Sequence, residues 1–210
     1  MTFRLFGFPI RVDTSAWLVF GFVVLSRAGL GPAGLKDGVI RAGVLLASIL
    51  VHELGHALVA RRLGLGPVGI MIHGFGGLTA SSRSPTPRQG LLMTAAGPGA
   101  GLLLAVAAAA GLLLLPGTGG AMGGILAEIL GINLFWSLFN LVPLHPLDGG
   151  MLLGHGLMAL GIQPGRVMST VRWVSLASAA IVGVWAVLSG WWFLLVVVGL
   201  AAVRHLKPPA

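Results

Sequence analysis

Two histidines and a glutamate have the spacing of a metal centre with its general base. His52 and His56 lie four residues apart in the pentad His-Glu-Leu-Gly-His, and on a helix they project from one face, about 40° apart. Glu53 is one step round the helix and can accept a proton from a metal-bound water. An acid at the centre of a membrane helix costs roughly 2.5–3.5 kcal/mol, so the pentad, inside a long apolar segment, indicates a functional metal site.

The composition argues against a chance match. Only 9% of the residues are charged and five are acidic, whereas 56% are hydrophobic, above the roughly 45–50% of soluble domains. The mean hydropathy of +0.98 predicts a multispanning membrane protein. The length of 210 residues suits one domain over residues 1–210, with a catalytic core near residues 39–160. Because the chain contains no cysteine, a zinc ion would be held by histidine and carboxylate.

The net charge of +8 does not indicate nucleic-acid binding. The basic residues stand singly between apolar segments, as topology signals at membrane edges do. With about six spans, most of the basic residues fall on one side of the membrane. This side includes both termini and Arg61-Arg62, which follow the pentad. The positive-inside rule therefore predicts a multi-pass protein of the cell membrane, with both termini and the active-site opening on the cytoplasmic side.

We expect an all-α membrane fold of about six transmembrane helices with a small cytoplasmic-side β-sheet. The sheet combines N-terminal strands with a membrane-associated hairpin near residues 68–81, around Gly74-Phe75-Gly76-Gly77. The third helix is expected to be interrupted at Gly97-Pro98-Gly99, and the last apolar segment is divided at Ser189-Gly190. The expected strands are 3–6, 10–13, 68–73 and 77–81, and the expected spans are 16–25, 39–60, 90–115, 121–142 and two within 171–203.

A catalytic zinc site has three protein ligands and an open position for water. Two carboxylates are candidates for the third ligand, Glu128 and Asp148. Asp148 follows the fourth span as it returns toward the cytoplasm, at the depth predicted for His52 and His56. Glu128 begins that span on the opposite side, so topology favours Asp148. Two alternatives stay open, namely that Asp148 is only a turn residue in Pro-Leu-Asp-Gly-Gly or that Glu128 is the ligand.

With these residues in place, the chain resembles the site-2 protease family of intramembrane zinc metalloproteases. The family joins an HExxH helix to a downstream Asn-Pro-Asp-Gly signature, which is similar here to the segment from Asn140 through Pro143 and Pro146 to Asp148-Gly149-Gly150. The hairpin glycines and the Ala-Ala-Gly-Pro of residues 95–98 also fit. The chain departs from the family in carrying Gly99 and Gly101 where a polar Asn is frequent, and it has no room for a PDZ or CBS domain.

The resemblance implies one Zn²⁺ per chain, bound by His52, His56 and Asp148, with Glu53 as general base and Asn140 holding substrate. It implies cleavage of peptide bonds in or next to the transmembrane helices of membrane-protein substrates, with the lipid bilayer and an unidentified regulatory membrane protein as further partners. Strand addition to the hairpin is a hypothesis for substrate binding. The alternative function is a zinc-binding membrane protein without peptidase activity, a transporter or chaperone-like homologue. The intact Glu53 argues against it, because metal binding alone needs no base.

Overall fold

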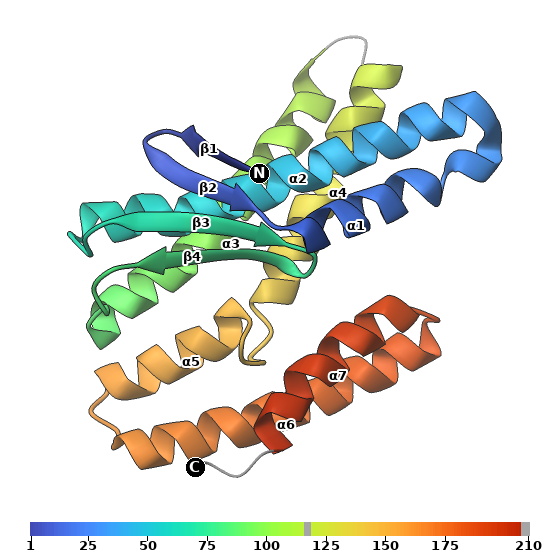
Figure 1. Cartoon of the computed structure of the whole chain (residues 1–210). Helices are drawn as coiled ribbons and strands as arrows, with labels where there is room; N and C mark the ends of the chain where they lie inside the picture. The colour runs from blue at the N-terminus through green and yellow to red at the C-terminus, as the bar shows by residue number, and fades with distance from the viewer. Residues whose placement is uncertain (116–118, 207–210) are drawn as a thin grey trace. The chain divides into compact units, whose positions relative to one another are not determined.

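The computed structural model describes residues 1–115 and 119–206. Helices dominate, and four strands form one small sheet (Figure 1). The elements in chain order are β1 (Thr2–Leu5), β2 (Phe8–Val12), α1 (Thr14–Leu25), the 3₁₀ turn η1 (Ala28–Leu30), α2 (Gly31–Arg62), β3 (Val68–His73), β4 (Gly76–Ser81), α3 (Pro87–Leu114), α4 (Ala121–Asn140), α5 (Asp148–Ala159), α6 (Pro164–Leu188) and α7 (Trp192–Leu206). The chain forms two compact units, Met1–Ser84 with Ala96–Leu138, and Pro85–Ala95 with Phe139–Ala210.

Within the described residues, four segments are long and apolar enough to cross a membrane: Thr14–Arg62, Pro87–Leu114, Ala121–Asn140 and Pro164–Leu188. The first of them contains both α1 and α2. With 12 residues, α1 extends about 18 Å, less than the roughly 30 Å of a hydrocarbon core. The multispanning character is therefore confirmed, whereas the predicted number of six spans is not.

The strands of the first unit are ordered β1-β2-β3-β4. Two antiparallel pairs, β1–β2 and β3–β4, are joined by a parallel pairing of β2 with β3. Alternate residues are buried, Phe8, Ile10 and Val12 in β2 and Val68, Ile70 and Ile72 in β3, as expected of a sheet with one covered face. The hairpin prediction is correct, and β4 rather than β3 is an edge strand of this sheet.

Helix α2 is longer than the sequence predicted, with 32 residues. It begins with Gly31 at φ 76°, followed by a proline in the first turn, a position where the missing N–H of proline costs nothing. Gly38 allows close packing with α1, because a Cβ there would lie only 2.6 Å from the carbonyl oxygen of Val24. The long helix holds its C-terminal half beside β3 and β4 (Figure 1).

The interruption predicted in the third helix is wrong. Helix α3 runs without a break from Pro87 to Leu114 with Pro98 inside it. Proline removes one N–H, the donor to the carbonyl of Thr94, and membrane helices tolerate such a loss. The neighbouring Gly97 instead leaves space for a side chain of α2, which matters for the site described below.

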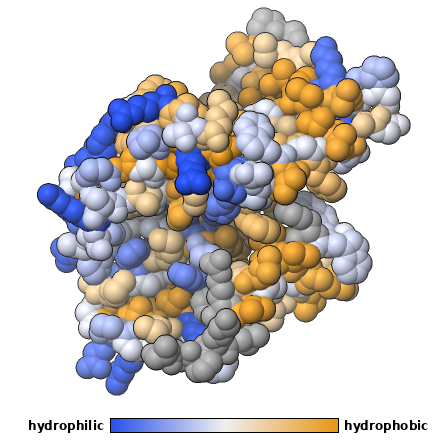
Figure 2. Space-filling view, viewed as in Figure 1, coloured by the Kyte–Doolittle hydropathy of each residue, from blue (hydrophilic) through white to orange (hydrophobic). Residues whose placement is uncertain are grey.

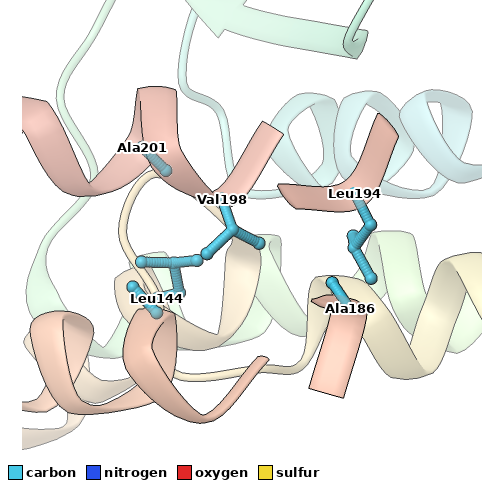
Figure 3. Packing of buried hydrophobic residues seen from close by; sticks show 6 residues of the cluster. Leu144, Ala186, Leu194, Val198 and Ala201 are labelled. Carbon is cyan, nitrogen blue, oxygen red and sulfur yellow. The ribbon is translucent and has the colours of Figure 1, made fainter. Parts of the chain in front are cut away.

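The second unit is organised by an α6–α7 hairpin. The chain turns at Ser189 and Gly190, as predicted, with Gly190 at φ 71°. Leu194 and Val198 of α7 pack with Ala186 of α6 and with Leu144 in the segment before α5 (Figure 3). Helix α6 begins at Pro164, seven residues before the predicted boundary, so it is a full-length candidate span rather than a short helix.

Hydrophobic side chains remain exposed on the helices of both units (Figure 2). Leu18 and Phe22 of α1 and Ile181 and Leu188 of α6 are each at least 70% exposed. Large exposed apolar surfaces on a monomer mark a surface that contacts another apolar phase. A bilayer is that phase for helices of this length and composition.

Candidate metal centre and catalytic base

The HELGH pentad lies on α2, and its three functional side chains are buried. His52 is 3% exposed, Glu53 4% and His56 7%. The Nε2 atoms of the two histidines are 3.2 Å apart, and the imidazole rings are close to perpendicular, at 81°. The prediction that these histidines share one face of a helix is confirmed by this geometry.

The two nitrogen atoms fit one zinc ion. Two ligands of a tetrahedral zinc, each at 2.0–2.1 Å, would be separated by about 3.3 Å, and the observed 3.2 Å agrees with this separation. A pair of imidazoles with converging Nε2 atoms can therefore occupy two of the four positions around zinc. The remaining positions need a third protein ligand and a water.

Small residues bring α3 against the pentad. A Cβ on Gly55 would lie 2.9 Å from the Cβ of Ala100, and a Cβ on Gly97 would overlap the imidazole of His56. One turn further along α3, a Cβ on Gly101 would overlap Ser137 of α4. Gly97 therefore leaves the space that the second histidine fills.

Glu53 lies against strand β4. The Thr79 hydroxyl is 2.7 Å from Glu53 Oε2 and donates a hydrogen bond to it. A Cβ on Gly77 would overlap the Glu53 side chain, so this glycine leaves the space that the carboxylate fills. Sequence reasoning missed both residues. The period-2 pattern of the predicted strand places Gly77 and Thr79 on one face, but it does not show that this face meets the pentad.

Glu128, the rival third ligand, is engaged elsewhere in the first unit. It forms a salt bridge with Arg41 of α2, and Arg41 in turn contacts Asp37 at 3.1 Å. Arg41 precedes His52 by eleven residues, which is about 16 Å along a helix axis. A carboxylate bound to Arg41 is therefore too far from His52 to share a metal ion with it.

Asp148 lies in the second unit, as the first residue of α5 rather than in an irregular turn. It is 8% exposed, and a carboxylate in the first turn is stabilised by the positive end of the helix dipole. A Cβ on either Gly149 or Gly150 would overlap the backbone of the preceding segment. The two glycines therefore allow this segment to pack directly against the start of α5. Asn140 is the last residue of α4.

The other histidines have local contacts. His73 ends β3, where its Nδ1 accepts a hydrogen bond from the backbone N–H of Phe75 at 3.2 Å. The backbone N–H of His145 donates to Ser175 Oγ at 2.9 Å. Half-buried His155 of α5 packs against Gly90, and burial lowers its pKa. Asn133 of α4 donates a hydrogen bond to Ser48 Oγ of α2 at 2.8 Å.

The fold and this pair of histidines indicate a polytopic membrane protein whose HExxH helix could hold a metal ion. Residues 41–124 match the model of peptidase family M50. A Synechocystis protein named "Putative zinc metalloprotease sll0528" is 36% identical over 90% of this chain and 56% of its own length. A Mycobacterium tuberculosis protein named "Putative zinc metalloprotease Rip3" is 32% identical over 90% of this chain and 55% of its own length.

The fold is also that of a solved structure, the site-2 protease from Methanocaldococcus jannaschii. The match has a TM-score of 0.71 and 21% identity, over 100% of this chain and 96% of the other. The chain spans just over half the length of the curated relatives it matches. The match to the model of peptidase family M50, the zinc metalloproteases among the relatives and the shared fold all relate this chain to the site-2 proteases.

Proposed function

We propose that this chain is a zinc-dependent intramembrane endopeptidase that cuts peptide bonds in or next to the transmembrane helices of membrane-protein substrates. The observation that carries the proposal is the buried His52–His56 pair, with Nε2 atoms 3.2 Å apart, beside a buried glutamate in a candidate membrane span. The zinc metalloprotease names of the relatives support the same metal and reaction.

One zinc per chain is proposed, bound by His52, His56 and Asp148. Zinc favours histidine nitrogen and carboxylate oxygen when no thiolate is available, and the chain has no cysteine. Asp148 is supported by its burial, by its place in the Asn-Pro-Asp-Gly-like segment and by the engagement of Glu128 with Arg41. Such a set leaves a fourth position for water.

The proposed reaction is hydrolysis by an activated water. When bound, zinc would lower the pKa of its water to roughly 7 and polarise the scissile carbonyl. Glu53 accepts the proton of the attacking water as the new C–O bond forms. It then delivers this proton to the amine that leaves when the C–N bond breaks. The apolar helices around the pentad exclude bulk water and so strengthen these electrostatic interactions.

Asn140 is proposed to hold the substrate near the metal. Its place at the end of α4, eight residues before Asp148, puts an amide donor and acceptor close in sequence to the proposed third ligand. Replacing Asn140 by Ala is expected to raise KM while zinc content is unchanged, because the lost contact serves substrate binding. An unchanged KM, or a loss of zinc, would remove Asn140 from this role.

The proposed location is the cell membrane, with both termini on the cytoplasmic side. The support is the excess of Arg and Lys on that side of the predicted spans. The natural chain lacks cysteine, so a single cysteine at residue 2 or 119 can be labelled without background. A membrane-impermeant thiol reagent applied to intact cells should label position 119 and leave position 2 unlabelled. The opposite pattern would invert the topology.

The non-proteolytic alternative, a transporter or chaperone-like protein, is not favoured. A transported ion needs polar or acidic groups along several spans, yet neither α3 nor α6 contains an Asp or Glu. Storage or transport of zinc also gives no role to a buried Glu53 hydrogen-bonded by Thr79.

Cleavage of a reporter tests the proposal. The reporter carries one transmembrane helix weakened by Gly and Asn, and it is mixed with the purified full chain in lipid vesicles. The proposal predicts a product that disappears with a zinc chelator and returns when zinc is restored. Absence of product from protein that has bound zinc, with several reporters of different sequence, would contradict it.

A further inference from the structure

Strand β4 has two unlike faces. Leu78 and Ala80 are exposed, while Gly77, Thr79 and Ser81 alternate with them and are half-buried. The half-buried face includes the two residues that touch Glu53, because side chains two apart in a strand point to the same side. The pairing of Gly77 with Ile72 and of Thr79 with Ile70 fixes this register, and both isoleucines are buried.

The β4 contacts hold one conformation of the Glu53 carboxylate. Gly77 leaves room for its Cγ, Cδ and Oε1 atoms, and the Thr79 hydroxyl donates to Oε2 at 2.7 Å. Thr79 Oγ1 is also 3.1 Å from the Glu53 backbone carbonyl oxygen, but its single proton serves the shorter contact to the charged acceptor. Hydrogen bonds to charged groups are stronger than those to neutral carbonyls. Oε1 lies against Gly77 of the same strand.

We propose that Thr79 is a positioning residue for Glu53: its hydroxyl holds Oε2 and so fixes the orientation in which the carboxylate meets the attacking water. This inference rests on the proposed function, since it needs Glu53 to be the base. In this proposal, edge strand β4 orients the Glu53 carboxylate. A general base must lie within hydrogen-bond reach of the proton that it abstracts, and loss of a supporting hydrogen bond costs about 10–100-fold in activity.

The first test compares Thr79→Val with Thr79→Ser in the full chain. Valine keeps the branched shape and removes the hydroxyl, whereas serine keeps the hydroxyl. We expect Thr79→Val to lower kcat about 10–100-fold with KM and zinc content unchanged, and Thr79→Ser to stay within about threefold of wild type. Ser81→Ala is the matched control, because Ser81 lies on the same face of β4 and donates to the Arg83 carbonyl instead. Its kcat should not change.

The second test does not depend on turnover. The chain contains two glutamates, Glu53 and Glu128, so ¹³C-glutamate labelling marks only two carboxylates for infrared spectroscopy. The difference spectrum between wild type and Thr79→Val should show a shifted carboxylate band for one glutamate, absent between wild type and Thr79→Ser. Glu53→Gln assigns the band. Gly77→Ala should shift the same band, because its Cβ displaces the Glu53 side chain.

The two tests separate the inference from the proposed function. An unshifted band in Thr79→Val, or equal losses of kcat in the valine and serine variants, would overturn the positioning role even if wild type cleaves the reporter. A shifted band together with a wild type that binds zinc but never cleaves would support the contact and contradict the protease.

Discussion

Replacing Glu53 by glutamine should abolish measurable cleavage while the protein keeps its zinc. Glutamine has nearly the same shape and can still bond to Thr79, but it cannot accept the proton of the attacking water. Loss of a general base lowers kcat by about 10²–10⁴-fold. The measurement is kcat on the single-span reporter, with zinc content determined on the same sample.

Glu128→Gln is the matched control for this prediction. It makes the same chemical change at the other glutamate, which pairs with Arg41, eleven residues before His52 on α2. Arg41 keeps its contact with Asp37 in this variant, so the protein should fold and retain cleavage. A Glu53→Gln protein as active as wild type would show that another group is the base.

Replacing Asp148 by asparagine should remove zinc. The amide keeps the volume of the side chain but loses the negative charge that a divalent cation favours, so we expect zinc affinity to fall by more than the roughly 10–100-fold typical of supporting residues. Cleavage should fall with it and recover partly at high zinc concentration. The measurement is zinc content by elemental analysis after dialysis against a weak chelator.

The same measurement distinguishes the two carboxylate candidates. Glu128→Gln should keep its zinc, since Glu128 is bound to Arg41, about 16 Å along α2 from His52. Loss of zinc from Glu128→Gln together with retention in Asp148→Asn would overturn the proposed ligand set. Loss from His56→Ala is expected in either case and verifies that the assay detects an emptied site.

The metal-binding face of the pentad could be predicted from the sequence because it depends on residues four apart on one helix, not on tertiary contacts. Spacing alone places His52 and His56 on one face, and their Nε2 atoms indeed converge. The bounds of β3 were equally predictable, since this strand carries apolar residues at every second position, whereas β2 begins at Phe8, two residues before the predicted strand. In these elements the pattern and the tertiary packing require the same conformation.

Features that depend on tertiary packing were not predictable in this way. The parallel pairing of β2 with β3 needs a long crossover, which α1 and α2 provide, and no local signal indicates it. The continuity of α3 through Pro98 runs against the local preference of its residues, and the predicted break was wrong for that reason. The contact of Thr79 with Glu53 joins residues 26 positions apart, so strand periodicity could indicate a face but not its partner.

The most direct test of the account is the mass of the products that the purified full chain forms from the single-span reporter in a bilayer. The account predicts a new terminus in or next to the apolar segment of the reporter, formed by wild type with zinc and absent with Glu53→Gln. Products of identical mass from wild type and Glu53→Gln would contradict it, as would zinc-loaded wild type that cuts only in the soluble flanks.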